Sequence, residues 1–516
     1  MRELNALKKL SSFVFHRTTL VALLLIVQAA VLAVMMVQFS NYFIYFYWFC
    51  ILLSIVAVLW LVSNRSDPGY KIAWLIPILL FPVFGGLVYL LFGGNRLSAR
   101  VRRKMQGMDR RMRNTLAPDF KSGLLESVGA DAVNQSRYLE WYAHCPLYKN
   151  TLTEYFPLGD DAFPRMLQEL RRAERYIFLE YFIITPGEMW SAILEILEEK
   201  AKAGVDVRVL YDDVGSLYTL PTNYDKVLEA KGIRCSVFNR FIPALSLRLN
   251  NRDHRKFCIV DGRAAFTGGI NLADEYINRE EKYGHWKDSV ILLRGEAVWS
   301  MVVMFLTVWD YVRGGEEDLN AFRPASLPQE VYAARGWVQP YADSPLDEEP
   351  VAGTVYLNLI SKARYYIYLT TPYLIISDTV NTALCSAAKS GVDVRIITPH
   401  VPDKKIIFEV TRAHYSPLLE AGVRIFEYTP GFMHAKNFAV DDLYATVGSV
   451  NMDYRSMFLH FEGGVWLCGQ DAVLDVRNDF LHTLEESMEV TLEQSRSHSL
   501  PRLLLRSVLR VFAPLM

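Results

Sequence analysis

Two widely separated stretches of the chain carry the same reactive side chains at the same spacing. Each has a histidine, a lysine two residues later, an aspartate five residues after that lysine, and then a small residue and an asparagine. The first set is His254, Lys256, Asp261, Gly269 and Asn271, and the second is His434, Lys436, Asp441, Ser449 and Asn451. Short motifs recur by chance, but two sets with one common offset indicate a duplicated site.

These side chains suit displacement at a phosphodiester. An imidazole can attack phosphorus or carry the proton of a leaving group, while an ammonium group and an amide stabilise charge on the phosphoryl oxygens. Two facing sets would supply a nucleophile, an acid and charge neutralisation around one phosphate. Each histidine also needs a carboxylate on its other ring nitrogen to fix its tautomer. Asp288 and Glu462 are the predicted partners.

The strands that follow the lysines decide which side chains share a face. Residues 257–260 and 437–440 are apolar, and a strand period of two places each histidine on the face of its lysine. Asp261 and Asp441 have the opposite parity and lie at hairpin turns. We therefore expect these two aspartates to be structural, although they belong to the candidate catalytic motif. The small residues after the returning strands would let backbone N–H groups approach an anion.

The elements around both sets alternate strands with helices, which is typical of an α/β fold. The first copy reads as a strand at 176–184, a helix at 189–203 and a strand at 205–211, and the second as a strand at 366–376, a helix at 379–389 and a strand at 392–398. The sequence Gly-Val-Asp-Val-Arg joins helix to strand in both copies. We expect two α/β halves that share one active site, at 135–313 and 351–490, with a Pro-rich acidic linker at 314–350.

The composition requires a second kind of structure. The 516 residues are 51% hydrophobic and 22% charged, with a net charge of -1. This composition excludes a disordered chain, and it is too apolar for an ordinary soluble enzyme. Uncharged runs at 18–39 and 42–62 are long enough to cross a hydrocarbon core of about 30 Å. A third run at 72–92 is broken by proline and glycine. We therefore expect N-terminal transmembrane helices within a membrane anchor at 1–95.

The basic residues set the expected orientation. Arginine and lysine are densest in a juxtamembrane linker at 96–134, which should lie in the cytoplasm with the catalytic halves. Two crossings plus a third segment that dips in and returns satisfy this rule better than three full crossings, which remain the alternative. The first run could also be a cleaved signal peptide, but no convincing cleavage site follows it.

The C-terminal tail at 491–516 has the pattern of an amphipathic helix. Arg502, Arg506 and Arg510 share one helical face, opposite apolar residues, which suits an anionic lipid surface. A helix packed on the protein's own core is the alternative. The six cysteines and the other histidines show no disulfide or metal-ligand spacing, and no nucleotide-binding glycine motif follows a strand. We expect no metal and no cofactor.

Over residues 135–490 the paired motifs resemble those of the phospholipase D superfamily. Further motifs resemble its bacterial cardiolipin synthase branch. They are Ala73-Trp74-Leu75, Tyr211-Asp212-Asp213, Arg252-Asp253-His254-Arg255-Lys256, Thr371-Pro372-Tyr373 and Asn451-Met452-Asp453-x-Arg455-Ser456. The apolar run at 18–39 is an addition to the usual pattern of that branch.

The resemblance implies a duplicated phospholipase D-like sandwich that transfers a phosphatidyl group from one phosphatidylglycerol to another, giving cardiolipin and glycerol without metal. It also implies a phosphohistidine intermediate and a multi-pass protein of the bacterial plasma membrane. By analogy, His254 is the nucleophile and His434 is the acid and then the base, although the pseudo-symmetry allows the reverse assignment.

Two other functions fit the same residues. A membrane-bound phospholipase D or phosphodiesterase would use water to resolve the intermediate, and a non-catalytic scaffold would only bind lipid. Nucleic acid is not expected, because 55 basic residues are balanced by 56 acidic ones. The two halves can complete a site within one chain, so a monomer suffices, and the oligomeric state is left open.

Overall fold

The computed structural model describes residues 30, 34, 43–64, 67–81, 85–86, 89, 99–117, 120–240, 251–345, 349–497 and 499–515. The chain forms two units. The first comprises residues 1–96 and 240–250, and the second comprises residues 97–239 and 251–516. The second unit contains both copies of the paired motif, and each unit is described by itself.

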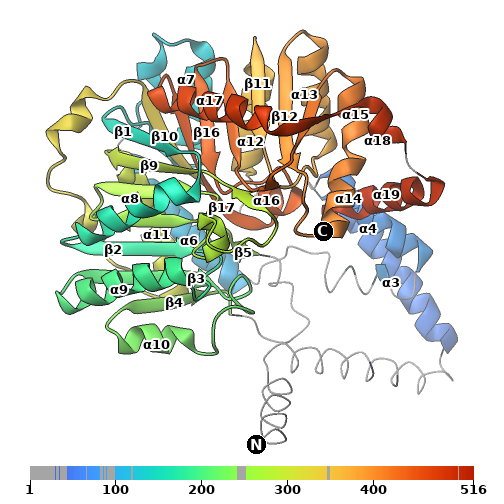
Figure 1. Cartoon of the computed structure of the whole chain (residues 1–516). Coiled ribbons are helices and arrows are strands. Elements are labelled where there is room, and N and C mark those ends of the chain that lie inside the picture. Colours follow the sequence, from blue (N-terminus) through green and yellow to red (C-terminus); the bar gives the residue numbers. More distant parts are fainter. Residues whose placement is uncertain are drawn as a thin grey trace, which may run out of the picture. The chain divides into compact units, whose positions relative to one another are not determined.

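The N-terminal unit contains helices α3 (Phe43–Ser63) and α4 (Pro68–Leu80) (Figure 1). The glycine pair that interrupts the apolar run allows a close approach of the backbone in this unit. At Gly86 an added Cβ would lie only 2.4 Å from Oγ of Ser54 on α3. Glycine is therefore required there by packing.

Within the described part of the chain, no helix combines the length and the apolar character needed to cross a membrane. The spans expected at 42–62 and 72–92 are thus not confirmed. In the second of these segments, α4 ends at Leu80, and Gly85, Gly86 and Tyr89 are also helical. The span expected at 18–39 lies outside the described residues, apart from residues 30 and 34.

The larger unit contains two main sheets. The strands of the first are β1 (Thr151–Phe156), β2 (Tyr176–Tyr181), β3 (Asp206–Asp212), β4 (Arg234–Phe238), β6 (Phe257–Val260), β7 (Ala264–Gly268) and β9 (Val290–Gly295). The main strands of the second are β10 (Trp337–Asp343), β11 (Tyr366–Thr370), β12 (Asp393–Pro399), β13 (Arg424–Tyr428), β15 (Asn437–Val440), β16 (Tyr444–Gly448), β17 (His460–Cys468) and β18 (Ser487–Val490).

The two sheets follow one plan. The first has the order β1-β9-β7-β6-β2-β3-β4, and the second has the order β10-β17-β16-β15-β11-β12-β13-β18. In each, three neighbouring strands run parallel, β2-β3-β4 and β11-β12-β13, and the remaining pairs in these orders are antiparallel. The predicted duplicated α/β fold is confirmed.

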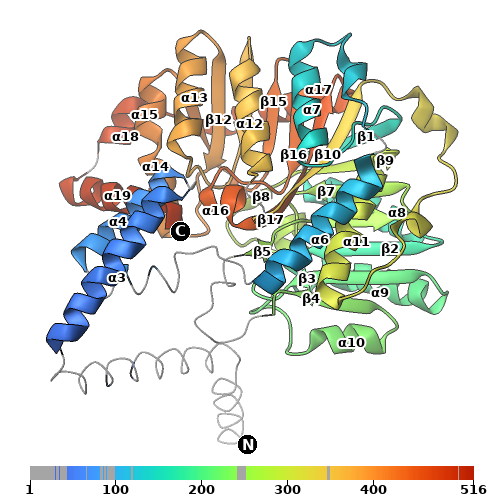
Figure 2. The ribbon, with the colours of Figure 1, turned by 180° about the vertical axis from the view of Figure 1, so that it is seen from behind.

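Helices cover both faces of each sheet. Those of this unit are α6 (Ala99–Leu116), α7 (Ala130–Trp141), α8 (Gly159–Arg171), α9 (Glu188–Lys202), α10 (Tyr224–Ala230), α11 (Val298–Arg313), α12 (Val351–Lys362), α13 (Asp378–Lys389), α14 (Lys405–Ala413), α15 (Tyr415–Glu420), α16 (Tyr454–Phe458), α17 (Asp471–Glu485), α18 (Leu492–Arg496) and α19 (Leu500–Phe512). Helices α8 and α9 lie in front of the first sheet and α17 in front of the second (Figure 1). Helices α11, α12 and α13 lie on the opposite side (Figure 2).

One apolar core joins the two halves. It includes Phe257 and Ile291 from the first sheet and Val447 and Trp466 from the second, all at most 2% exposed. Helix α11 contributes to the same core along nearly its whole length. The two sheets therefore pack as one body, which fixes the paired motifs relative to each other.

Strand β10 lies within the segment expected to be a linker. It pairs antiparallel with β17, as β1 pairs with β9, so it repeats the edge strand of the first sheet. Pro340 lies in this edge strand, where proline is tolerated although it has no N–H group to donate. A proline-rich composition thus concealed a strand.

The segment expected as a basic juxtamembrane linker also contains part of the fold. Helix α6 packs on α11, where Arg111 forms an ion pair with Asp310 and Lys104 donates a hydrogen bond to the carbonyl group of Tyr311. Part of the basic cluster is therefore used within the protein.

Candidate active site

Two short parallel ladders cross between the halves of the larger unit. In one, β5 (Arg252–Asp253) pairs with the first two residues of β17. In the other, β14 (Gly431–Met433) pairs residue for residue with β8 (His285–Lys287). The residues that follow these paired positions are the two motif histidines and the two predicted carboxylates. Each ladder therefore places a histidine of one half beside a carboxylate of the other half.

Glu462 holds the imidazole of His254. Nδ1 of His254 lies 2.9 Å from Oε1 and 3.1 Å from Oε2 of Glu462, which is fully buried. Burial would raise the pKa of Glu462, but the neighbouring His254 lowers it overall, so the carboxylate is ionised and can only accept a hydrogen bond. Nδ1 is thus the donor, and Nε2 retains its lone pair for chemistry.

Asp288 holds His434 in the same way. Nδ1 of His434 lies 2.5 Å from Oδ2 of Asp288. The main-chain N–H group of His434 donates to the carbonyl oxygen of Lys287 at 2.7 Å. Burial would raise the pKa of Asp288, but His434 and Lys436 lower it below its ordinary value. Both predicted carboxylates therefore contact a motif histidine, and each does so across the halves.

Burial keeps both imidazoles neutral at rest. It lowers the pKa of His254 to about 3, against the opposing effect of Glu462. It lowers the pKa of His434 to about 4, and the charge of Lys436 acts in the same direction while Asp288 opposes it. A neutral imidazole is the form that can act as a nucleophile or a base.

The small residue of each motif serves its carboxylate differently. At Gly269 an added Cβ would lie 1.9 Å from Oδ1 of Asp288, so only glycine leaves room for this carboxylate. In the other half, the hydroxyl of Ser449 donates to Glu462. The N–H groups of Gly269 and Ser449 donate to main-chain carbonyl groups at 3.0 and 2.9 Å. They are not free for an anion, so that expectation is wrong.

The two lysines are buried beside the histidines. In each half the ammonium group donates to the carbonyl oxygen of its own motif histidine. Burial is the main cause that lowers the pKa of Lys256 to about 7 and that of Lys436 to about 8. Each lysine also lowers the pKa of His434, so the two motif sets lie within electrostatic reach of one another.

The two asparagines differ in their contacts. Asn271 accepts a hydrogen bond from the Ile183 N–H group at 3.1 Å and donates to the hydroxyl of Tyr276 at 2.7 Å, so it supports the walls of the site. Asn451 is buried, and no hydrogen-bond partner for its Oδ1 occurs in the part of the chain that is described.

Asp261 and Asp441 are structural, as their parity predicts, and their inclusion among the catalytic residues is corrected. The carboxylate of Asp261 accepts hydrogen bonds from three consecutive backbone N–H groups, of residues 174–176, each at 2.8 Å. Asp441 does the same for residues 364–366 at 2.7 to 2.9 Å. Each aspartate thus ties a hairpin turn to the residues before β2 or β11, and neither contacts the histidines.

Aromatic side chains that the sequence reasoning missed surround the imidazoles. The ring of His254 lies 5.2 Å from Phe182 and 5.5 Å from His460, measured between centroids. The ring of His434 lies 5.3 Å from Trp286 and 5.4 Å from Tyr276. A signal existed in part, because Trp286 and His460 each stand two residues before a predicted carboxylate.

Comparison with known proteins follows the same division of the chain. Residues 166–289 and 356–484 match the family described as cardiolipin synthase, PLD-like domain, and residues 52–94 match the phospholipase D-nuclease N-terminal family. A Bacillus anthracis protein named cardiolipin synthase 2 is 35% identical over 474 residues, which are 88% of each chain. The chain belongs to the cardiolipin synthase family.

Two further proteins are similar to this chain. An uncharacterized Streptococcus mutans protein is 42% identical over 466 residues, which are 89% of this chain and 99% of that one. The crystal structure of phosphatidylserine synthase from Haemophilus influenzae Rd KW20 has a TM-score of 0.55 at 15% identity, and covers 74% of this chain and 98% of that chain. The second likeness shows a shared fold. Membership of the cardiolipin synthase family makes the chain a phosphatidyltransferase that acts on phospholipids.

A buried charged cluster supports the first motif. Arg255 forms ion pairs with Glu180 at 2.6 Å and Asp253 at 3.0 Å. Asp212 accepts hydrogen bonds from three N–H groups, including that of Asp253 at 3.1 Å, and burial raises its pKa to about 7. Glu180 is therefore buried and paired, and this cluster fixes the short strand β5 that directly precedes His254.

The described residues include one group with the donor atoms for a metal ion. Ligand atoms of His254, His460 and Glu462 lie within 4.8 Å of one another. In this group Glu462 already accepts from His254, which is the arrangement a nucleophilic imidazole needs.

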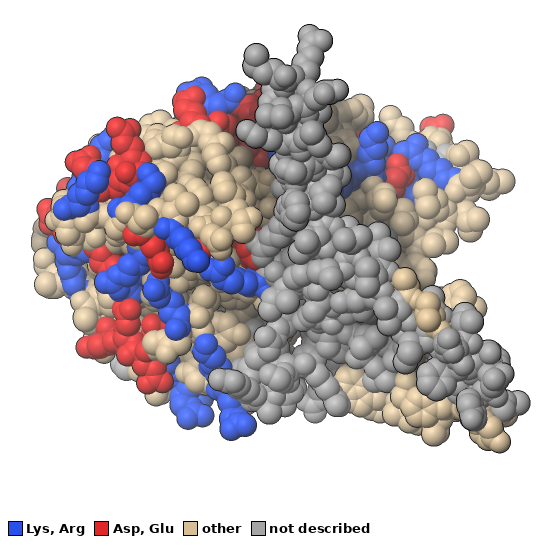
Figure 3. Space-filling view, turned by 90° about the horizontal axis from the view of Figure 1, so that it is seen from below, with Lys and Arg blue, Asp and Glu red and all other residues tan. Residues whose placement is uncertain are grey.

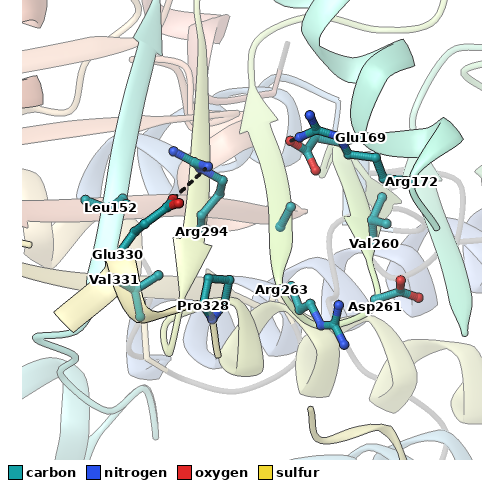
Figure 4. Close-up of a pocket in the computed structure, with 11 residues that line it drawn as sticks. Leu152, Glu169, Arg172, Val260, Asp261, Arg263, Arg294, Pro328, Glu330 and Val331 are labelled. Atoms are coloured by element: carbon teal, nitrogen blue, oxygen red, sulfur yellow. Dashed lines mark hydrogen bonds and ion pairs between the residues drawn. The ribbon is translucent and has the colours of Figure 1, made fainter. Parts of the chain in front are cut away.

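A separate pocket of about 170 Å³ opens at the Asp261 turn (Figure 4). Its lining includes the basic residues Arg172, Arg263 and Arg294 and acidic residues such as Glu330. Arg294 lies 3.9 Å from Glu330. Its lining contains neither motif histidine, so it is not part of the histidine site.

Proposed function

We propose that this enzyme transfers a phosphatidyl group from one phosphatidylglycerol to a second through a phosphohistidine on His254. The observation that carries the proposal is the reciprocal pairing, in which each imidazole is oriented by a buried carboxylate from the other half. Two oriented imidazoles give one nucleophile and one proton carrier, and the two lysines supply positive charge. The experiment that tests this is incubation of the purified protein with phosphatidylglycerol alone.

In the first displacement, Nε2 of neutral His254 attacks phosphorus, and the bond from phosphorus to the glycerol oxygen breaks. When the anionic phosphodiester binds, it raises the pKa of His434, which takes up a proton from solvent at Nε2, and Asp288 stabilises the imidazolium. This proton then passes to the departing glycerol oxygen and leaves His434 neutral. Glu462 stabilises the positive charge on the substituted His254, and glycerol leaves.

In the second displacement, His434 is neutral again and removes the proton from a hydroxyl of the second phosphatidylglycerol. The oxygen of that hydroxyl attacks phosphorus, and the bond between phosphorus and His254 breaks. The sum is two phosphatidylglycerols converted to one cardiolipin and one glycerol. The buried ammonium groups of Lys256 and Lys436 neutralise the phosphoryl oxygens in both transition states.

Hydrolysis is the alternative, because water could replace the second lipid. Equal amounts of cardiolipin and free glycerol support the transferase, whereas phosphatidic acid with little cardiolipin would identify a phospholipase D. No turnover by a folded protein would support a lipid-binding scaffold and contradict both enzymes.

We further propose that the enzyme works at the bacterial cell membrane, with its α/β halves in the cytoplasm. Large apolar side chains of α3 are exposed, among them Trp48 at 64% and Leu59 at 63%. Two crossings with a broken third segment stay a prediction. A cysteine placed at Asn95 should react with a membrane-impermeant reagent only after cell lysis, and labelling of intact cells would contradict the orientation.

A further inference from the structure

Helix α19 lies on the larger unit with two of its three arginines bound to the protein. Nε of Arg506 donates to Oε2 of Glu409 on α14 at 2.8 Å, and Nε of Arg502 donates to the same oxygen at 3.1 Å. These bonds are the main cause that lowers the pKa of Glu409 to about 2, so the carboxylate is ionised. Arg506 is only 5% exposed. Two of the three arginines expected to meet lipid are therefore bound to the protein.

Apolar side chains of α19 reinforce this attachment. Leu509, and Ala513 directly after the helix, pack in a cluster with Val410 of α14 and Tyr454 of α16. Together with the arginines they define the inner face of the helix. The orientation of α19 is thus set by both charge pairing and apolar packing.

The outer face of α19 is apolar. Its exposed large apolar residues are Leu500 at 81%, Leu504 at 68%, Leu505 at 50%, Val508 at 47% and Val511 at 36%. Spacings of three and four residues place most of them in one stripe along the helix. Figure 3 shows charges of both signs intermingled over the left part of the view, whereas uncharged surface surrounds a small charged group at the upper right.

We propose that this apolar face of α19 inserts into the interfacial layer of a lipid bilayer. A soluble protein has little reason to fix a helix with two arginines inward and five large apolar residues outward. Exposed Arg510 lies at the flank of the stripe, where it can meet the phosphate groups of anionic lipids. The binding partner that fits this surface is a bilayer that contains anionic lipid.

The same helix is connected to the histidine site by apolar packing. Tyr373 packs against the α19 cluster and also against the core cluster that includes Trp286 and Phe432. Both of these rings contact the ring of His434, at 5.3 and 5.7 Å between centroids. The packing of the inner face of α19 is therefore continuous with the aromatic side chains around His434. This connection rests on the proposed function, whereas the insertion of α19 does not.

The direct test is a depth measurement on the full-length protein. A polarity-sensitive fluorophore is attached at Val508→Cys, in a background that carries Cys385→Ser because the five other cysteines are buried. The protein is reconstituted in vesicles of phosphatidylcholine and phosphatidylglycerol that contain nitroxide-labelled acyl chains. The emission should fall about two-fold or more relative to vesicles without nitroxide. A fluorophore at Glu493→Cys, on exposed and polar α18, should be quenched far less.

Equal quenching at both positions, or none at Val508→Cys, would overturn the proposal. Energy transfer between labelled copies without lipid quenching would identify a second copy as the occupant and would also overturn it. Quenching at Val508→Cys in a protein that makes no cardiolipin would leave the insertion standing and remove the proposed function.

A pair of variants links insertion to catalysis. Leu504→Gln with Val508→Gln should lower the rate on phosphatidylglycerol vesicles by about ten-fold, because the polar amides oppose insertion. The matched control is Val227→Gln, an exposed apolar position on α10 at 44% exposure, which should leave the rate unchanged. Unfolding curves of all variants should coincide. An unchanged rate in the double variant would show that α19 is not used for lipid access.

Discussion

Nδ1 of His254 lies 2.9 Å from Oε1 of Glu462, a carboxylate 208 residues further along the chain. The reciprocal contact joins His434 to Asp288 at 2.5 Å. Each half therefore supplies the carboxylate that orients the other half's histidine. The pseudo-symmetric site is complete only when both halves are folded together, and one chain provides both.

The first prediction concerns which carboxylate serves which histidine. Glu462→Gln should lower kcat by about 10²- to 10⁴-fold, because a neutral amide neither fixes the tautomer of His254 nor stabilises its positive charge. In ¹⁵N spectra of histidine-labelled protein, this change should move the Nδ1 signal of His254 and leave that of His434 in place.

Asp288→Asn is the reciprocal control. It should move the Nδ1 signal of His434 and not that of His254. The opposite pattern would mean that each carboxylate serves the histidine of its own half, which the observed ladders exclude.

The second prediction concerns the small residues of the two motifs. Gly269→Ser copies the other half, yet it should abolish measurable turnover, because the new Cβ would collide with the carboxylate of Asp288. The reverse copy, Ser449→Gly, removes only one hydrogen bond to Glu462 and should lower kcat by about ten-fold. Similar rates in both variants would contradict the packing described for Gly269.

The third prediction concerns the motif aspartates. Asp261→Asn should lower the free energy of unfolding by about 1–3 kcal/mol, because a buried carboxylate that accepts from three N–H groups is replaced by an amide. Asp441→Asn should cost less, since Asp441 is more exposed. Denaturant unfolding measures the stability, and active-site titration corrects the rate for the folded fraction. A large fall in the rate per folded molecule, without loss of stability, would show that these aspartates have a catalytic role.

The fourth prediction is a pH dependence. The pKa of Lys256 is lowered to about 7 and that of Lys436 to about 8. Both lysines lose charge as the pH rises through these values, so kcat/KM should fall on the alkaline side from about pH 7 upward. On the acid side, the pKa of His254 near 3 keeps the nucleophile neutral down to low pH.

Lys256→Arg is the control for the fall in kcat/KM at alkaline pH. Arginine keeps its charge, so the decline in kcat/KM should move to higher pH even though the absolute rate falls. A profile with an unchanged alkaline limb in this variant would show that Lys256 does not cause it.

Much of the fold and site was predictable because local rules determine it. The period of two in the strands placed each lysine with its histidine and set the aspartates apart. The short strands β5 and β14 are different, because their pairing partners lie in the opposite half. Sequence reasoning named Asp288 and Glu462 as partners but had no local signal for the exchange between halves.

The other differences have similar physical causes. The proline of β10 resembles linker composition, yet an edge strand tolerates it. The arginine stripe of α19 resembles a lipid-facing surface, yet Glu409 of a distant helix binds it. In both cases the deciding partner is remote in sequence.

The most direct test of the account uses a phosphatidyl ester of p-nitrophenol, whose leaving group departs without an acid. His434→Asn should release one p-nitrophenol per site in a burst and accumulate a phosphatidyl adduct on His254. Mass spectrometry after an alkaline quench, in which phosphohistidine survives, locates the adduct. His254→Asn should give neither burst nor adduct. An adduct on His434, or a burst that survives His254→Asn, would contradict the assignment of His254 as the nucleophile.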